Sequence, residues 1–324
     1  MDDFPVPRIE RGIFCERPEG QNNFIAISKR LKNKPKAAEP PKILAKRCLM
    51  QEKDKEKMPT GIASLDPILE GGVPPGSVIL LLGDSGGGNY EFAYSSLIHL
   101  LQLGREKGIR GAILPREIEY ITFTRLEEDV KSEILNSFQI DDLENLLSGV
   151  RFRDLSEQYF DASIVPDDWY GHSDIKSRLE KRSGHESTLV QLSSVISETQ
   201  DSSLIILDSV TDMVSQISTP ALWQNLTGFL RGLQRISKQK KLTTYLLLSS
   251  DILDPSRENE IADIVDAVIL FKWEETTGAR RQRVMYFEKF RGVMPHLEER
   301  DLVKFAVRIT PAGGFEVSNI RVII

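Results

Sequence analysis

The sequence predicts an α/β fold with a mostly parallel central sheet, helices on both faces and antiparallel strands at the C-terminal end. Between residues 77 and 249, short apolar runs alternate with helical patterns. Such runs are typical of strands that are buried on both faces and joined through helices. Between residues 267 and 317, strand patterns follow one another with only short turns between them. This spacing favours antiparallel pairing.

The expected parallel strands are apolar runs, each followed by a turn and a helical pattern. They lie at Ser77–Leu82, Glu119–Thr124, Val150–Asp154, Leu204–Asp208 and Thr243–Ser249. The expected helices lie at Tyr90–Glu106, Glu127–Phe138, Thr188–Thr199 and Ala221–Lys238. The expected antiparallel strands lie at Ala267–Trp273, Gln282–Phe290, Val303–Thr310 and Gly314–Val317.

The N-terminal part of the chain differs in character from the rest. Residues 1–57 hold 14 Lys and Arg against 9 Asp and Glu, a net charge of +5, which leaves −11 on the rest from a total of −6. A Lys-rich segment at residues 28–57 contains three prolines, and such segments bury too little apolar surface to offset their ordering entropy. We expect an N-terminal extension and linker over residues 1–57, with at most a short helix around Ile43–Met50. One domain is expected over residues 58–324.

Composition excludes several classes of protein. With 40% hydrophobic and 28% charged residues, the chain resembles an ordinary globular protein with a sizeable core. Cys15 and Cys48 are far apart and suit neither a disulfide framework nor a metal site, so a reducing, cytoplasmic compartment is expected. The histidines show no ligand spacing, and no metal site is predicted. No apolar run reaches membrane-spanning length, and the N-terminus lacks the pattern of a signal peptide.

A glycine-rich turn follows the first expected strand and precedes a helix, which is the layout of a phosphate-binding loop. The full pattern for such a loop is G-x-x-x-x-G-K-[ST]. The candidate nucleotide-binding residues of this loop are Gly83, Asp84, Ser85, Gly86, Gly87, Gly88, Asn89 and Tyr90. Both framing glycines are present, but Asn89 stands at the lysine position and Tyr90 at the Ser/Thr position.

These two replacements remove the chemical side chains of the loop. A lysine would supply a charged hydrogen bond of about 1.5–3 kcal/mol, whereas Asn89 carries no charge. The phenol of Tyr90 is too long to ligate Mg²⁺ from that backbone position, and Asp84 adds a negative charge beside the phosphates. The loop is therefore either a tight turn only or a weak residual nucleotide site. Three consecutive glycines slightly favour residual binding.

The run Leu204–Asp208 is apolar and ends in an aspartate, as does the strand that holds the Mg²⁺ shell in an active P-loop enzyme. An ordinary buried strand with a polar end would read the same way. Its place after a P-loop remnant makes Asp208 a further candidate for the nucleotide site.

Several segments resemble one family. The stretch Thr60–Ser77 (TGIASLDPILEGGVPPGS) resembles the start of RecA-superfamily domains of the KaiC/RadA type. Tyr120–Phe123 is similar to the KaiC strand before its catalytic glutamates, and Asp266–Phe271, Glu288–Gly292 and His296 are similar to the KaiC ending. The resemblance covers about residues 58–320, and archaeal KaiC-like proteins of the HTR-like sort are the nearest group. It implies a RecA-like three-layer fold, a P-loop and the cofactors ATP and Mg²⁺.

The departures from the family bear on activity. Two adjacent glutamates follow the second strand in the family, but Thr124 and Arg125 stand at these positions. Neither can act as a carboxylate base, because arginine stays protonated and threonine has no carboxylate. Glu127 and Glu128 are expected in the first turn of the next helix, where acidic groups favour the dipole. Lysine, hydroxyl and catalytic acid are all missing, so no catalytic residue, no hydrolysis and no required cofactor are predicted.

Two cations of the family pattern are retained. The resemblance implies that Lys289 and Arg291 reach into the nucleotide site of a neighbouring subunit. The alternative is that both are surface residues in ion pairs worth little. If the first interpretation holds, the protein completes the site of a partner.

Three functions remain open at the level of sequence. The first is a non-hydrolysing regulatory, signalling or assembly-scaffold protein, either a homo-oligomer or a hetero-oligomer with an active paralogue. The second is an ATP-binding protein or slow ATPase with an atypical P-loop. The third is a nucleic-acid-binding scaffold, which the basic run at residues 280–283 and the Lys-rich arm would serve. A polar stretch, Asp161–Glu186, is expected to be a long functional or mobile loop.

Overall fold

A nine-stranded sheet forms the centre of the computed structural model, which describes residues 57–106, 112–160, 163–166, 169–170, 188–276 and 280–319. These residues belong to one compact unit, residues 51–324. The sheet order is β3-β2-β4-β5-β1-β6-β7-β8-β9. The strands are β1 (Val78–Gly83), β2 (Ile118–Thr122), β3 (Val150–Asp154), β4 (Leu204–Asp208), β5 (Thr243–Ser249), β6 (Ala267–Thr276), β7 (Arg280–Phe290), β8 (Lys304–Thr310) and β9 (Gly314–Asn319).

The sheet has a parallel part and an antiparallel part. Strands β3, β2, β4, β5, β1 and β6 pair in parallel with their neighbours. Strands β6 to β9 pair antiparallel in chain order. The predicted fold class, a RecA-like α/β sheet with antiparallel C-terminal strands, is confirmed.

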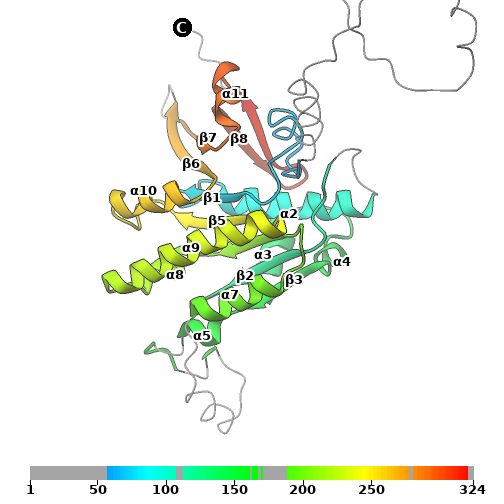
Figure 1. Ribbon diagram of the computed structural model, residues 1–324. Coiled ribbons are helices and arrows are strands. Elements are labelled where there is room, and N and C mark those ends of the chain that lie inside the picture. Colours follow the sequence, from blue (N-terminus) through cyan, green and yellow to red (C-terminus); the bar gives the residue numbers. More distant parts are fainter. Residues whose placement is uncertain are drawn as a thin grey trace, which may run out of the picture. The chain divides into compact units, whose positions relative to one another are not determined.

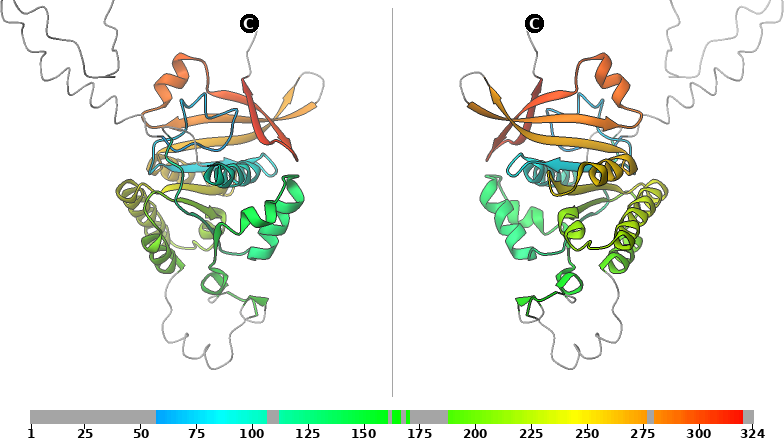
Figure 2. Two further views of the ribbon diagram at one scale, coloured as in Figure 1. Left: turned by 90° about the vertical axis from the view of Figure 1, so that its right-hand side faces the viewer. Right: turned by 90° about the vertical axis from the view of Figure 1, so that its left-hand side faces the viewer.

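Helices cover both faces of the parallel part (Figure 1). The helices are α2 (Asn89–Arg105), α3 (Glu127–Ser137), α4 (Leu143–Leu147), α5 (Ser156–Phe160), α7 (Thr188–Glu198), α8 (Val210–Ser215), α9 (Pro220–Lys240), α10 (Pro255–Ile264) and α11 (Met294–Glu299). Figure 2 shows α3 and α4 in green on one side of the sheet and α7 and α9 in yellow-green on the other. No helix in the described part of the chain combines the length and the apolar character needed to cross a membrane.

The two hydrophobic cores follow from the alternation of side chains along each strand. In β1, Ile79 and Leu81 pack into one core with α2, α3 and α4. Leu80 and its neighbours on the opposite face pack into the other core with α7, α8, α9 and α10. Every residue of β1 is buried, which explains why this strand reads as a continuous apolar run rather than an alternating one.

The sequence patterns do not predict α4, α5, α8, α10 or α11, because short helices carry too few periods to be recognised. Their capping residues gave a usable signal. The Ser209 side chain accepts from the Asp212 backbone N–H and the Asp212 side chain caps Ser209 in return, which starts α8. The Asp254 side chain caps α10 ahead of Pro255 at its first position. The predicted helix at Ile43–Met50 and most of the predicted loop at residues 161–186 fall outside the described residues.

The segment before β1 is held by one carboxylate. Asp66 Oδ1 accepts hydrogen bonds from the backbone N and the Oγ1 of Thr60, both at 2.7 Å, and Asp66 Oδ2 accepts from the backbone N of Gly61 at 3.2 Å. These bonds give a physical reason for the T-G-x-x-x-x-D spacing. The carboxylate closes a turn, so the motif serves the fold at this point.

A substitution at Gly72 tests how tightly this segment is packed. Its φ is +125°, and an added Cβ would lie 2.0 Å from the backbone oxygen of Met58. We expect Gly72→Ala to lower the free energy of unfolding by about 2 kcal/mol through strain and overlap. Gly71 is the matched control, because its φ is +105° but nothing lies within 4 Å of an added Cβ. Denaturant unfolding of both variants should show the smaller loss for Gly71→Ala; equal losses would contradict this account.

Candidate functional site

The glycine-rich loop lies at the carboxyl edge of the parallel strands, between the end of β1 at Gly83 and the start of α2 at Asn89. Asp208 ends β4 and pairs in register with Thr122, the last residue of β2. Because parallel strands bring their carboxyl ends to the same edge, the loop, Asp208 and the residues after β2 meet there. The sequence-predicted residues 83–90, Asp208 and Arg125 therefore lie together at this edge.

The glycines of the loop have packing reasons of their own. An added Cβ on Gly87 would lie 2.7 Å from the backbone oxygen of Phe271. Gly86 and Gly88 have φ values of +69° and +116°, which disfavour other residues. Three consecutive glycines are therefore needed for this turn with or without a phosphate, and their retention alone does not indicate a bound nucleotide.

Asn89 and Tyr90 contact other residues of the chain and do not replace the lysine and hydroxyl of a P-loop. Asn89 is buried, and its amide carbon would lie 2.5 Å from a Cβ on Gly83, so this side chain packs inside the turn. The Tyr90 hydroxyl donates a hydrogen bond to Asp208 Oδ1 at 3.2 Å. The residue at the hydroxyl position of the loop therefore contacts the aspartate directly.

Asp208 is held by three donors of the same chain. Besides Tyr90, the Tyr120 hydroxyl donates to Asp208 Oδ2 at 2.7 Å, and Arg125 Nη1 donates to the same oxygen at 3.0 Å. The Asp208 side chain is only 1% exposed. We call Tyr90, Tyr120, Arg125 and Asp208 the aspartate cluster.

Further contacts fix Arg125 in this position. Its Nη1 also donates to the Tyr94 hydroxyl at 2.9 Å, and its Nη2 forms an ion pair with Glu133 on α3. The guanidinium lies 5.9 Å from the centre of the Tyr90 ring. Tyr94 and Tyr120 were not expected at the site. The spacing of Tyr90 and Tyr94 by four residues on one helix is the sequence signal that could have pointed to Tyr94.

The protonation states of the aspartate cluster suit its hydrogen bonds. Burial raises the pKa of Asp208, while the hydrogen bond from Tyr120, the charge of Arg125 and the hydrogen bond from Tyr90 favour its ionised form. Burial also raises the pKa of Tyr90 and of Tyr120, and the nearby Asp208 charge adds to this. Both tyrosines therefore remain neutral donors at physiological pH, and Arg125 supplies the positive charge.

The residues present do not fit a Mg²⁺–nucleotide complex of the usual P-loop kind. A metal ion bound by way of Asp208 would compete with three donors that already occupy both carboxylate oxygens. Its positive charge would also lie close to the Arg125 guanidinium, and like charges repel. The loop offers no lysine for the phosphates.

Side chains from the antiparallel strands contact the outer side of the loop. The backbone N of Trp273 donates to Asp84 Oδ2 at 3.1 Å, and its Nε1 donates to the Ser85 oxygen at 3.2 Å. Arg283 Nε donates to the Gly86 oxygen at 2.8 Å, and its guanidinium lies 4.4 Å from the centre of the Trp273 ring. The sequence analysis did not assign Trp273 or Arg283 to the site, because strand pairing across the chain decides their position.

The comparisons with known proteins place the chain in a family. A family model described as ATPase: KaiC matches residues 58–319. The chain belongs to the KaiC ATPase family. Among solved structures, a KaiC-like protein from the hyperthermophilic archaeon Pyrococcus horikoshii OT3 is similar at 18% identity with a TM-score of 0.54, covering 82% of this chain and 99% of that one. The flagellar accessory protein FlaH from Methanocaldococcus jannaschii is similar at 17% identity and a TM-score of 0.50, over 79% of this chain and 95% of that one. No curated protein matches the chain.

The positions of the KaiC-family catalytic glutamates hold residues with other contacts. Thr124 Oγ1 donates to Asp212 Oδ1 at 3.4 Å, and Arg125 belongs to the aspartate cluster. Glu127 and Glu128 lie exposed in the first turn of α3, and Glu127 pairs with Lys131.

The two retained cations of the KaiC-family ending contact the C-terminal end of α10. Lys289 Nζ donates to the backbone oxygens of Ala262 and Asp263 at 2.6 and 2.8 Å. Arg291 Nη2 also donates to the Asp263 oxygen. Cations are favourable at a helix C-terminus, so both residues have a role within the chain. Their contact with a neighbouring subunit stays a prediction.

Proposed function

We propose that this KaiC-family protein does not hydrolyse ATP and acts through protein contacts, in regulation, signalling or assembly. The aspartate cluster is the observation that supports this proposal best. Asp208 stands where an active P-loop enzyme holds Mg²⁺, yet Tyr90, Tyr120 and Arg125 bind both of its oxygens. Phosphoryl transfer depends on positioning and charge stabilisation. The groups that would provide them are either absent or, as for Asp208, hydrogen-bonded to other side chains of the chain.

Residual nucleotide binding is compatible with this proposal only in a weak form that does not depend on a metal. Loop N–H groups and the start of α2 favour an anion. Asn89 adds no charge, and Asp84 lies within the loop, where its carboxylate accepts a hydrogen bond from the Trp273 backbone N. We therefore infer that any bound nucleotide is held without Mg²⁺.

The assembly partner is proposed to be a second copy or an active paralogue. Lys289 and Arg291 would have to leave the end of α10 to reach a neighbouring nucleotide site. If Lys289→Ala and Arg291→Ala leave the ATPase rate of a mixed active paralogue unchanged, that role is wrong.

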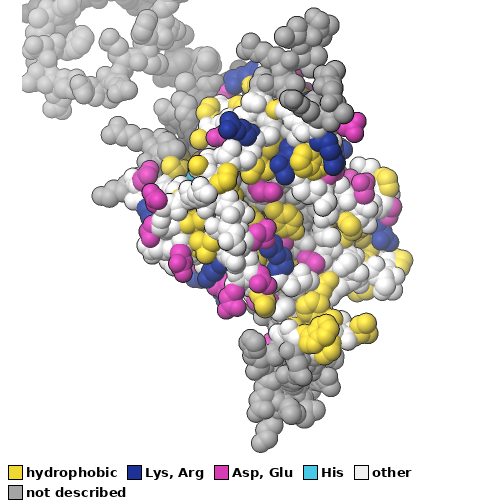
Figure 3. Space-filling view, turned by 180° about the vertical axis from the view of Figure 1, so that it is seen from behind, with side chains coloured by type: hydrophobic (Ala, Val, Ile, Leu, Met, Phe, Trp, Pro, Cys, Tyr) yellow, Lys and Arg dark blue, Asp and Glu magenta, His cyan; other side chains and the backbone are white. Residues whose placement is uncertain are grey.

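A nucleic-acid scaffold is less well supported by the surface. Figure 3 shows acidic and basic side chains interspersed over the described residues of one face, instead of a broad basic surface. Arg283 of the basic run is bonded to the loop and stacked on Trp273. Phosphate binding needs several free cations on one surface, and the described residues of this face do not present them.

Titration with fluorescent ATP in Mg²⁺ and in EDTA tests the proposal. We expect the affinity to be weak and the same in both, because the metal has no free carboxylate to link to the phosphates. The variant Asn89→Lys with Tyr90→Thr is the comparison that restores both chemical side chains. A charged hydrogen bond of about 1.5–3 kcal/mol predicts roughly 10- to 150-fold tighter binding for it. Tight binding by the unmodified protein that disappears in EDTA would contradict the inference that any bound nucleotide is held without Mg²⁺.

A further inference from the structure

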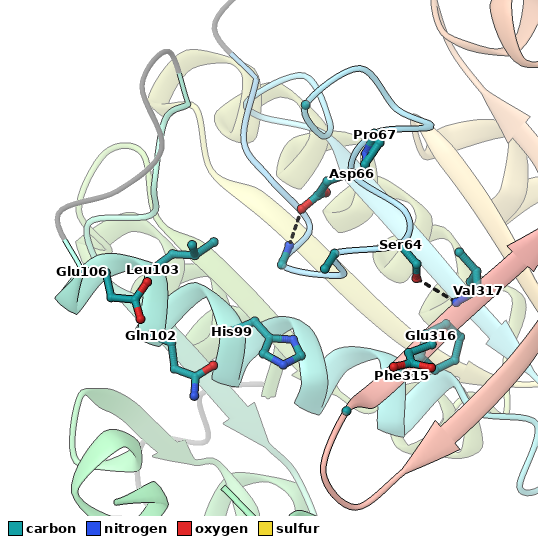
Figure 4. Close-up of a pocket in the computed structure, with 14 residues that line it drawn as sticks. Ser64, Asp66, Pro67, His99, Gln102, Leu103, Glu106, Phe315, Glu316 and Val317 are labelled. Carbon is teal, nitrogen blue, oxygen red and sulfur yellow. Dashed lines mark hydrogen bonds between the residues drawn. The ribbon is translucent and has the colours of Figure 1, made fainter. Parts of the chain in front are cut away.

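A cavity lies away from the aspartate cluster and is not used by the proposed function. It has a volume of about 850 Å³ and lies between the segment 61–71, α2 and the start of β9. Figure 4 shows Ser64, Asp66 and Pro67 on one side, with β9 on another and α2 along a third. His99 is the first α2 residue of the lining and stands ten residues after Asn89, which corresponds to about 15 Å along a helix. The cavity is therefore a separate site.

Hydrogen bonds hold the walls of this cavity in place. Ser64 Oγ accepts from the backbone N of Val317 at 2.8 Å, which ties the segment 61–71 to β9. Ser95 Oγ accepts from the backbone N of Phe315 at 2.9 Å, which ties β9 to α2. Three elements far apart in sequence are thus fixed around one space. A volume of this size lies within the range of small-molecule sites, roughly 300–1,000 Å³.

Apolar side chains supply much of the lining. Pro67, Leu103, Phe315 and Val317 come from all three elements. Phe315 and Val317 are buried members of the hydrophobic core, so the wall at this point is part of that core. A ligand with an apolar body would bury surface against these residues, and burial of apolar surface is the main source of affinity in such sites.

The charged groups of the lining are all acidic. Glu106 and Glu316 are exposed and Asp66 is partly buried, and none of the described residues that line the cavity is a lysine or arginine. Burial lowers the pKa of His99, which keeps this ring neutral at physiological pH. His99 Nδ1 is buried without a hydrogen-bond partner. The described part of the lining therefore carries negative charge and favours a positively charged ligand.

We propose that this cavity binds a small organic cation with an apolar body, such as an aryl-alkyl or alkyl amine. The apolar walls take the body, and Glu106 and Glu316 attract the ammonium group. An anionic molecule of the same shape would be repelled by both carboxylates. The inference does not depend on whether the chain hydrolyses ATP, and either can fail without the other.

Three probes of similar shape and different charge test the proposal on the full chain: 2-phenylethylamine, 2-phenylethanol and phenylacetate. Ligand-observed NMR titration should show saturable binding in the order amine, alcohol, carboxylate. Ala63→Trp and Leu103→Trp, which fill the cavity from two sides, should abolish binding of the amine. Thermal unfolding of both variants shows whether they fold, and one folded variant is sufficient.

Removal of the acidic groups separates charge attraction from apolar contact. Glu106→Gln with Glu316→Gln should weaken the amine roughly two- to fivefold for each carboxylate and leave the alcohol unchanged, as expected for exposed ion pairs. Saturable amine binding that both kinds of variant weaken supports the site. No saturable binding, equal binding of phenylacetate, or amine binding that survives in a folded cavity-filled variant would overturn it.

Discussion

Replacement of Arg125 by methionine is expected to lower the free energy of unfolding by about 3–5 kcal/mol, because it leaves the buried Asp208 carboxylate without its cation. Methionine keeps much of the volume of the side chain and removes only the charge and the donors. Tyr90 and Tyr120 continue to donate to Asp208, but neither carries a charge. Denaturant unfolding of the variant and the unmodified chain gives the difference directly.

Arg231→Met is the control for this variant. Arg231 pairs with Glu260 at 3.2 Å on the surface, with side chains 58% and 39% exposed. Exposed pairs contribute less than about 1 kcal/mol, so this variant should change stability little. Equal losses for Arg125→Met and Arg231→Met would show that Arg125 is an ordinary surface arginine.

The loss in Arg125→Met is also expected to depend on pH. Burial already raises the pKa of Asp208 above the ordinary value of 3.8, and removal of the cation raises it further in the folded state only. The folded variant then binds a proton at Asp208 more readily than its unfolded chain, so the contribution of this group to stability is greatest at acid pH and falls as pH rises through the folded pKa. Unfolding should be measured from about pH 4 to about pH 8. The difference in free energy of unfolding between the unmodified chain and the variant should grow with pH.

Asp208→Asn is the second large effect, with an expected loss of about 2–4 kcal/mol in the absence of nucleotide and metal. The amide presents one acceptor and one donor group to three donors, and Arg125 loses its buried counter-charge. If Asp208 served to bind Mg²⁺ and had no partner in the chain, loss of its charge in the absence of metal would raise the free energy of unfolding or leave it unchanged. Asp263→Asn is the control, because the Asp263 side chain is 89% exposed.

The double variant shows whether the two residues act together. If Arg125 and Asp208 stabilise each other, the combined loss should be smaller than the sum of the single losses by about 1–3 kcal/mol. In the double variant neither a carboxylate nor a guanidinium is left without its partner. Additive losses would mean that the aspartate cluster is not a coupled unit.

The fold could be predicted from the sequence because the central parallel strands β1, β2 and β4 are buried on both faces. Runs such as Leu204–Asp208 carry no alternation, and this predicts a parallel strand covered by helices. Short helices escaped prediction, since α8 and α11 have six residues each and depend on tertiary packing.

The candidate site could be predicted only in part. Asn89, Tyr90 and Arg125 could be identified as departures from the P-loop pattern by position alone. Their contacts could not, because they depend on the pairing of β2 with β4 and on side-chain directions across the sheet edge. Tyr120 gives the clearest example. In the sequence pattern it is one more apolar residue of a strand, yet its hydroxyl donates the shortest of the three hydrogen bonds to Asp208.

Phosphate release from purified protein in saturating Mg²⁺ and ATP tests the central claim most directly. Because Asp208 is bound by Tyr90, Tyr120 and Arg125, the rate is expected to equal the background rate and to be the same in Asp208→Asn. Turnover well above background that Asp208→Asn abolishes would contradict the account.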